Sequence, residues 1–223
     1  MAPIALTIKW LGHACFLITT MAGSNVVIDP FGSGLGYEVP GVKADVVFVS
    51  HGHFDHNAVD VLKGGPEVIG PLSGKSSDHG TIKIGNDRIR YKSVLAYHDP
   101  SGGKQRGANT IRVIEVDGVR ICHLGDLGHI LTASQVKAIG RVDVLMIPVG
   151  GVYTIDGAQA KKVVQQLKPG YVIPMHYKTP ALKINLDTAD EFLKGYKHVK
   201  RADKLQVSKD SLPKETTVVV LKY

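Results

Sequence analysis

Residues 51–56 read His51-Gly52-His53-Phe54-Asp55-His56 and directly follow an apolar run at 46–49. Because side chains alternate along an extended chain, His51 and His53 point to the same side. If the chain then turns into a helix, Asp55 and His56 return toward the same space. Three imidazoles and a carboxylate at one point are costly to bury without a cation, and they suit zinc or a neighbouring first-row metal. The stretch therefore predicts a metal site at the end of a buried strand, with a histidine-rich surface turn as the alternative.

The size and composition of the chain are those of an ordinary globular protein. Its 223 residues are 43% hydrophobic and 21% charged, so a core can form without disulfides. We expect a single domain over residues 1–223. Cys15 and Cys122 lie in strand-like runs without CxxC spacing, so we expect buried thiols and no disulfide framework.

The charge of the chain favours anionic partners. Lysine and arginine number 27 against 20 aspartates and glutamates, which gives a net charge of +7. Such an excess fits an anionic substrate or a nucleic-acid surface. The basic run at 194–204 contains Tyr196 but no nucleic-acid motif, so we expect a solvated face there. We predict a small, anionic substrate and no nucleic-acid partner; the sequence also allows a homo-oligomer.

Residues 10–28 contain no Asp, Glu, Lys or Arg, which raises the question of a membrane span. Turn-forming residues at 22–25 interrupt this stretch, so two strands of a hairpin fit better than a helix. The residues before position 9 lack the basic region of a signal peptide. We expect a cytoplasmic protein that does not contact a membrane.

The order of the expected elements predicts an α/β (α+β) fold with stacked sheets and helices outside them. Runs rich in β-branched residues predict strands over residues 4–10, 15–20, 25–29, 45–50, 67–70, 81–84, 88–98, 110–116, 119–124, 142–148, 171–174 and 216–221. Asp117-Gly118 predicts a tight hairpin between two of these strands.

Four helices are expected. Capping boxes predict three helix starts, at Thr132-x-x-Gln135, Asp156-x-x-Gln159 and Thr188-x-x-Glu191. Residues 56–63 predict a short fourth helix that ends before the Gly64-Gly65-Pro66 stretch.

Several of the expected strands end in a side chain that can bind a metal. Besides the cluster at 51–56, these residues are Asp29, His98, Asp126 and His176. In layered α/β folds, functional sites form beyond the carboxyl ends of strands. A single histidine of this kind is usually a structural residue, but the repeated pattern favours a set of metal ligands.

These motifs together resemble the metallo-β-lactamase superfamily over essentially the whole chain. They comprise His-x-His-x-Asp-His, a later histidine, a Gly-Asp after a strand and a last histidine toward the C-terminus. The phrases at 11–16 (LGHACF), 121–126 (ICHLGD) and 173–177 (IPMHY) resemble the metal-dependent hydrolases around the ascorbate-phosphate lactonases. N-acyl-phosphatidylethanolamine phospholipase D is a more distant relative in this comparison.

The resemblance implies a four-layer αββα sandwich with a dinuclear metal site at the edge of the sheets. Carried over by position, one ion would be bound by His51, His53 and His98. The other would be bound by Asp55, His56 and His176, and Asp126 would bridge the two. Asp29 resembles the family's early aspartate, which orders the ligand loop by hydrogen bonding.

Further polar residues near strand ends are candidates for supporting roles. His13 is a candidate for a residue that faces the site and supports the ligands. Asn109, as an oxyanion donor, and His129, Tyr153 and Lys178 are candidates for substrate contacts. The glycine-rich basic segment 101–107 predicts a loop whose role the sequence leaves open.

The implied site leads to a hydrolytic mechanism. Two divalent ions, most readily zinc but also manganese or iron, would share a water and supply hydroxide near neutral pH. Asp55 would orient this hydroxide or carry a proton to the leaving group. We therefore predict a metal-dependent hydrolase of a small, anionic ester, lactone or phosphodiester. A metal-dependent nuclease and a non-catalytic metal-binding protein of the same fold are the alternatives.

Overall fold

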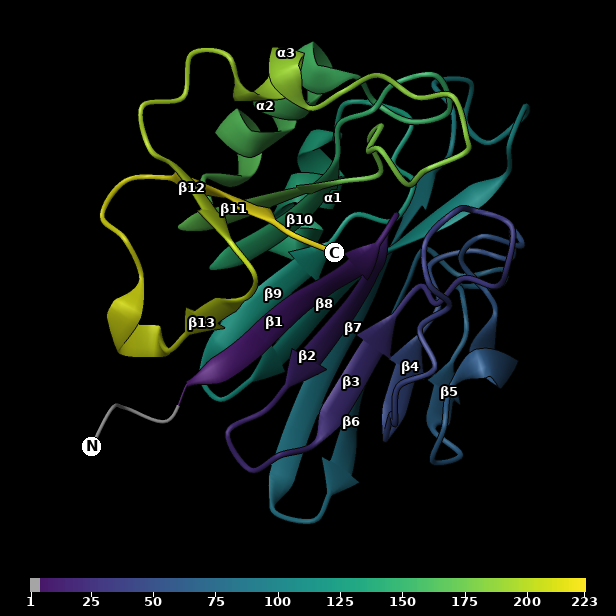
Figure 1. Cartoon of the computed structure of the whole chain (residues 1–223), viewed down its shortest axis with the longest axis vertical. Helices are drawn as coiled ribbons and strands as arrows, with labels where there is room; N and C mark the ends of the chain where they lie inside the picture. Colours follow the sequence, from purple (N-terminus) through teal and green to yellow (C-terminus); the bar gives the residue numbers. More distant parts are fainter. Residues whose placement is uncertain (1–4) are drawn as a thin grey trace.

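Two β-sheets lie face to face in the computed structural model, which describes residues 5–223 (Figure 1). The strands of the first sheet are β1 (Leu6–Gly12), β2 (Cys15–Thr19), β3 (Asn25–Ile28), β4 (Val46–Phe48), β5 (Glu67–Ile69) and β13 (Leu205–Val207). Those of the second are β6 (Ser77–Ile84), β7 (Asp87–Tyr97), β8 (Ala108–Val116), β9 (Val119–His123), β10 (Val144–Pro148), β11 (Tyr171–Met175), β12 (Val199–Ala202) and β14 (Thr217–Leu221). Their spatial orders are β13-β1-β2-β3-β4-β5 and β12-β14-β11-β10-β9-β8-β7-β6.

The alternation of side chains gives the first sheet two apolar faces. Phe16, Ile28 and Phe48 point between the sheets and belong to the main hydrophobic core. Their neighbours Val27 and Val47 point the other way, into a second cluster that is completed by residues from the loops around 31–37 and 182–186. A strand with both faces covered is expected to read as a continuous apolar run, as these strands do.

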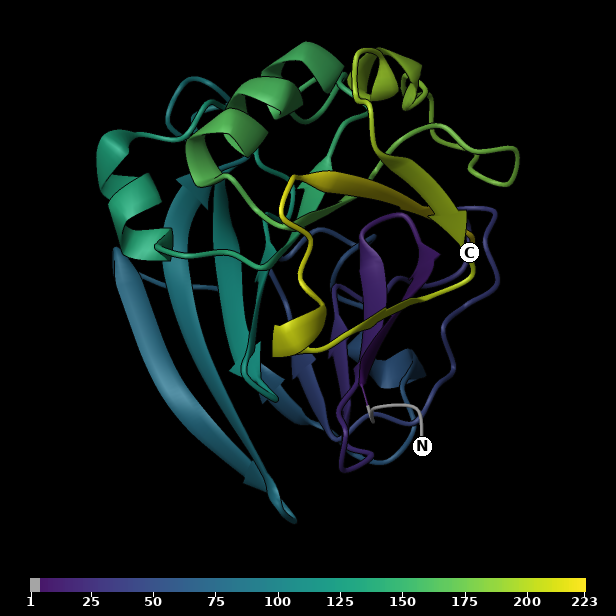
Figure 2. The same ribbon diagram turned by 90° about the vertical axis from the view of Figure 1, so that its left-hand side faces the viewer.

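Three α-helices pack on the second sheet: α1 (Ala133–Ile139), α2 (Gly157–Leu167) and α3 (Asp190–Leu193). Figure 2 shows them together along one side of the molecule. The predicted α+β sandwich is thereby confirmed. Within residues 5–223, the outer layer of the first sheet consists of loops and one 3₁₀ turn at Val59–Val61. Every helix of the described chain is too short or too polar to span a bilayer.

Two of the three helix starts predicted from capping boxes, and the tight hairpin, are confirmed. The capping boxes at Thr132 and Asp156 form, each with a reciprocal hydrogen bond from its glutamine partner. Asp117 and Gly118 both have positive φ angles, of 54° and 75°, and connect β8 to β9 by a two-residue turn. This backbone conformation matches the twist of a hairpin, which explains the reliability of the Asp-Gly signal.

The predicted helix over residues 56–63 is wrong, because Lys63 at its end forms a parallel β-bridge with Lys43 instead. Lys63 donates its backbone N–H to Val42 and accepts a hydrogen bond from Ala44, so only a 3₁₀ turn forms before it. The third capping box, at Thr188, is also wrong. Helix α3 begins at Asp190, and the Thr188 hydroxyl donates to the Asp190 carboxylate rather than capping the helix.

The basic run at 194–204 includes an edge strand that the sequence did not predict. β12 pairs with β14, and its residues are mostly exposed, so the predicted solvated face is present on a strand. β13, a second unpredicted strand, pairs with β1. The predicted first strand included Ile4, which lies outside the described residues.

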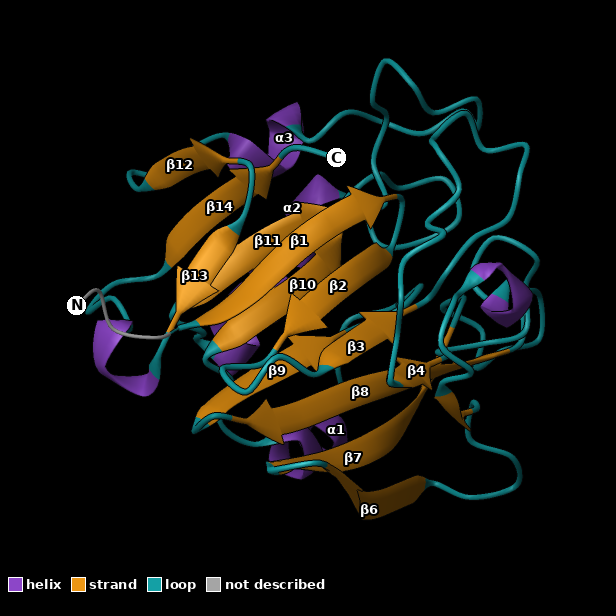
Figure 3. Cartoon of the chain, turned by 60° about the horizontal axis from the view of Figure 1, so that its bottom comes forward, coloured by secondary structure: helices purple, strands orange, loops and turns teal. Residues whose placement is uncertain are grey.

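The sheet topology places the ends of six ligand-bearing strands at the same edge. β3 and β4 are parallel, and β9, β10 and β11 are parallel. β1 is parallel to β3, with the antiparallel strand β2 between them, and β7 is parallel to β9, with the antiparallel strand β8 between them. β1 and β7 therefore also end at this edge. Figure 3 shows the loops that leave these strands gathered on one side of the sandwich.

We predict that Phe16→Ala lowers the free energy of unfolding by about 3–5 kcal/mol, because Phe16 is fully buried between the sheets and the substitution leaves a cavity. Phe54→Ala is the matched control, since Phe54 is 72% exposed, and its effect is expected to stay within about 0.5 kcal/mol. Denaturant unfolding of both variants provides the comparison. Equal losses of stability would contradict this description of the core.

Candidate metal centre

Six strands each deliver a ligand-type side chain to the same edge of the sandwich. The residues that follow β1, β3, β4, β7, β9 and β11 are His13, Asp29, His51, His98, Asp126 and His176, all of them at most 3% exposed. His53, Asp55 and His56 follow in the loop after His51. The convergence that the sequence pattern indicated is therefore present in the structure.

Asp126 lies at the centre of this group. Its Oδ2 atom is 3.1 Å from His98 Nε2 and 3.2 Å from the Nε2 atoms of both His56 and His176. His51 Nε2 is 3.9 Å away. One buried carboxylate oxygen is thus surrounded by four imidazoles.

The other ligand-type atoms form two separate groups and a third group that shares one histidine with each. The first contains His51, His53 and His98, the second contains His13, Asp55, His56 and His176, and the third contains Asp29, His51 and His56; within each, the candidate ligand atoms lie within 4.8 Å of one another. The structure therefore brings together all seven residues that were predicted as ligands. His13 joins them, which the sequence had suggested only as a supporting role.

The charges in the site are strongly coupled. Burial alone would raise the pKa of Asp126, but His176 and His56 hold it well below its usual range. Burial likewise opposes protonation of His56, yet Asp126 and Asp29 raise the pKa of that imidazole. Burial together with His56 lowers the pKa of His51 to about 3. His51 is accordingly a neutral imidazole at neutral pH, the form that binds metals.

The polar atoms of the cluster fit a bound cation. Four of the six buried side-chain atoms that lack a hydrogen-bond partner within residues 5–223 belong to the cluster: His13 Nδ1, His56 Nε2, Asp126 Oδ1 and His176 Nδ1. Buried polar groups are normally paired, so such a concentration of unpaired atoms is unfavourable without a further ligand. Imidazole nitrogen and carboxylate oxygen are the ligands of zinc, manganese and iron, which makes this set suitable for a divalent metal.

Asp29 and Ser50 hold the ligand loop in place. Asp29 accepts hydrogen bonds from the Ser50 backbone N–H at 2.7 Å and from the Ser50 hydroxyl at 2.6 Å. Its Oδ2 is also 3.0 Å from His56 Nδ1, which leaves His56 Nε2 facing Asp126. Ser50 was not singled out from the sequence, although its position directly before His51 was a usable signal.

Three site residues adopt left-handed backbone conformations. The φ angles of His13, Asp29 and His176 are 53°, 47° and 51°. Such conformations cost about 1–3 kcal/mol each for non-glycine residues and are concentrated at functional sites. Each lies directly after a strand, where the reversal turns the side chain into the cluster.

His13 and His123 are anchored differently. His13 Nε2 lies 3.1 Å from Asp55 Oδ2, and the His13 carbonyl accepts hydrogen bonds from Trp10 Nε1 and from the His176 backbone N–H. His123 donates to the Ala14 carbonyl and accepts from the Gly125 N–H, so it has a buried structural role.

Three of the four candidates for substrate contact are engaged with the protein backbone instead. Asn109 is fully buried, donating to the Leu124 carbonyl and accepting from the Asp126 N–H, so it positions Asp126. His129 accepts from the Tyr97 N–H and donates to the Ile130 carbonyl. Lys178 Nζ donates to the carbonyls of Leu182 and Ile184. None of the three lines the cavity described next.

A cavity of about 510 Å³ opens onto the cluster. Its lining includes the candidate ligands His53, Asp55, His98, Asp126 and His176, together with Phe54, Arg106, Tyr153 and Ile184. Tyr153 is thus the one predicted substrate-contacting residue that the structure places there. Phe54, Arg106 and Ile184 were not predicted from the sequence as lining residues, because a lining position depends on loop geometry rather than on local pattern.

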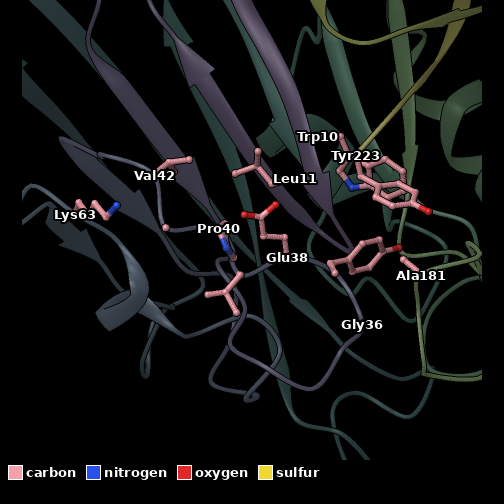
Figure 4. A pocket seen from close by; sticks show the side chains of 12 residues that line it. Trp10, Leu11, Gly36, Glu38, Pro40, Val42, Lys63, Ala181 and Tyr223 are labelled. Carbon is pink, nitrogen blue, oxygen red and sulfur yellow. The ribbon is translucent and has the colours of Figure 1, made fainter.

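A larger cavity of about 640 Å³ lies elsewhere, beside the end of β1 (Figure 4). Trp10 and Tyr223 stand side by side in its wall, and Glu38 and Lys63 supply its charged groups. Its lining contains no histidine or cysteine, whereas the smaller cavity is lined by five of the candidate metal ligands.

Comparisons with known proteins agree with this geometry. The family model of the beta-lactamase superfamily domain matches residues 7–176. The chain belongs to the metallo-β-lactamase superfamily. A UPF0173 metal-dependent hydrolase of Methanoregula boonei is 36% identical over 192 residues, covering 77% of this chain and 82% of the relative. A UPF0173 metal-dependent hydrolase of Thermococcus kodakarensis is 33% identical over 193 residues, covering 77% and 84%.

A solved structure extends the similarity to almost the whole chain. It is a Thermotoga maritima protein described as a Zn-dependent hydrolase of this superfamily, with 39% identity, a TM-score of 0.76, and coverage of 98% of this chain and 100% of that one. This chain is a metal-dependent hydrolase, as the sequence predicted. The names of these relatives state a reaction class and no substrate.

We predict that Asp29→Asn weakens metal affinity about 10- to 100-fold, because the amide cannot accept every hydrogen bond that Asp29 accepts from Ser50 and His56. Asp45→Asn is the matched control. Asp45 accepts a hydrogen bond from the Asn25 N–H at the opposite end of β3 and β4. Zinc titration against a competing chelator measures both variants, and equal affinities would contradict the role assigned to Asp29.

Metal binding is expected to release protons at pH 7. The pKa values of His56 and His98 are raised above the ordinary value by Asp126, so without metal both imidazoles bind protons more readily, and a cation must displace those protons. Metal affinity should therefore be lower at pH 6 than at pH 8. Calorimetric titration in buffers of different ionisation enthalpy counts the protons, and a pH-independent affinity without proton release would refute this prediction.

Proposed function

We propose that this metal-dependent hydrolase uses two divalent ions, most readily zinc, to cleave a small, anionic ester, lactone or phosphodiester. The position of Asp126 carries the proposal. Its Oδ2 approaches members of both ligand groups, at 3.1 Å from His98 and 3.2 Å from His56 and His176. A carboxylate between two sets of imidazoles is suited to bridge two ions.

The ions, when bound, would polarise the scissile carbonyl or phosphoryl oxygen and make water nucleophilic near neutral pH. Asp55 can accept the proton of that water. Burial opposes its ionisation, but the hydrogen bond from His13 and the neighbouring imidazoles hold the pKa of Asp55 well below its usual range. Asp55 is therefore an ionised carboxylate whose Oδ2 is fixed by His13 Nε2, ready to take a proton and pass it to the leaving group.

The expected charge of the substrate follows from the cavity. The carboxylates of Asp55 and Asp126 are the negative groups in its wall, and Arg106 is a positive one. Two divalent ions would make this surface cationic and favour anionic substrates. A cavity of about 510 Å³ suits a small molecule.

The test is metal analysis of protein purified without chelator, followed by a panel of matched esters, lactones and phosphodiesters. We expect about two ions per chain and turnover of an anionic member of the panel. One ion per chain would refute the dinuclear site. A fully loaded protein inactive on the whole panel would favour the non-catalytic alternative, whereas cleavage of RNA or DNA alone would favour the nuclease.

Asp55→Asn should lower kcat by about 10²- to 10⁴-fold, because an amide cannot accept the proton. Asp60→Asn is the control, since Asp60 is exposed in the adjacent 3₁₀ turn. The metal content of both variants is measured alongside the rate. Full activity of Asp55→Asn would exclude the proposed proton transfer.

A further inference from the structure

Arg106 is a positive group in the cavity wall with no acidic partner. Of the carboxylate oxygens in residues 5–223, none lies within 4.0 Å of its guanidinium, whereas Arg90, Arg120 and Arg141 all form ion pairs. Its side chain lines the same cavity as His98 and Asp126. A guanidinium has five N–H donors, and among the described residues 5–223 only one acceptor, the Val152 carbonyl, is reached, at 3.5 Å from Nη2. The remaining donors are available to a ligand.

The loop that carries Arg106 is fixed to the metal centre by Asp99. The Asp99 carboxylate accepts backbone hydrogen bonds from Ser101, Gly103, Gln105 and Arg106 at 2.8–3.1 Å. Asp99 follows His98 directly, and the His98 N–H donates to the Gly107 carbonyl. The backbone of Arg106 is therefore held at a set position relative to a candidate ligand.

Tyr153 supplies the surface against which Arg106 lies. The Arg106 guanidinium carbon is 5.7 Å from the centre of the Tyr153 ring, and the Tyr153 carbonyl is 3.1 Å from His98 Nδ1. Stacking on an aromatic ring leaves the edge of a guanidinium free for a planar, two-point contact with an anion. Phe54 and Ile184 add apolar surface to the same cavity.

We propose that Arg106 and Tyr153 form a subsite that binds the negative group of the substrate, and that the substrate carries this group on an apolar or aromatic body. Phe54, Tyr153 and Ile184 would contact that body. The inference rests on the proposed function in one respect, namely that the scissile bond lies at the histidine cluster. With this subsite, the expected substrates are amphiphilic anions rather than small anions in general.

The binding of one charged probe and one uncharged probe of similar shape tests the subsite without requiring turnover. Benzenesulfonate has an aryl ring and an anionic group that binds metal ions weakly, and methyl phenyl sulfone is its neutral counterpart. Ligand-detected NMR on the metal-loaded protein measures both affinities. We expect Arg106→Gln to weaken benzenesulfonate binding about tenfold or more and to leave sulfone binding unchanged. Tyr153→Ala should weaken both probes.

Lys104→Gln is the matched control, because Lys104 is an exposed cation of the same loop that does not line the cavity. Its binding of benzenesulfonate should stay within twofold of the parent protein. An equal loss in Lys104→Gln, or an unchanged affinity in Arg106→Gln, would overturn the proposal. Equal weakening of both probes by Arg106→Gln, with an altered thermal melt, would also overturn it and assign Arg106 a merely structural role.

The subsite and the proposed hydrolytic function can succeed or fail independently in these experiments. Selective loss of benzenesulfonate in Arg106→Gln, in a protein that hydrolyses nothing, would support the subsite while the hydrolytic proposal fails. Conversely, hydrolysis of anionic aryl esters by Arg106→Gln at the parental kcat/KM would leave the hydrolytic proposal intact and refute the subsite.

Discussion

The buried carboxylate of Asp126, surrounded by four imidazoles, is the interaction on which the rest of the structure depends. A charged group in this position, 2% exposed, is costly unless partners compensate it. The imidazoles provide part of that compensation at 3.1–3.9 Å. They also compete with one another for protons, since protonating one disfavours protonation of the next. A bound divalent metal would resolve both conflicts, because it would neutralise the carboxylate and require neutral imidazoles.

Such an arrangement needs rigid support, and the support comes from both sheets. Asn109 fixes the Asp126 backbone, and Asp29 fixes Ser50. Arg112, although only 1% exposed, has carbonyls and a hydroxyl as partners: it reaches from β8 to the carbonyls of Val49 and Gly70 in the first sheet and to Ser93. This buried cation joins the two sheets directly behind the ligand loop.

The wall and the floor of the cavity differ in burial and in the kind of element that supplies their residues. The floor consists of the buried residues His98, Asp126 and His176, which follow strands. His176 has a left-handed backbone conformation. The wall consists of loop residues such as Phe54, Arg106 and Tyr153, which are at least partly exposed. Core packing fixes the floor, whereas loops tolerate change, so a common metal centre can be combined with different substrate preferences.

The sequence by itself determined the sandwich class and the candidate metal ligands, because both depend on local patterns. Strand periodicity, the Asp-Gly turn and the side chains that follow each strand are all readable without coordinates. Only the tertiary structure decided that Lys63 pairs with residues 42–44, so that residues 56–63 do not form a helix, and that Asn109 and Lys178 bind backbone carbonyls. It also placed Arg106 over Tyr153 across 47 positions of sequence. These outcomes depend on contacts between distant segments, and no local pattern encodes which loop will face which.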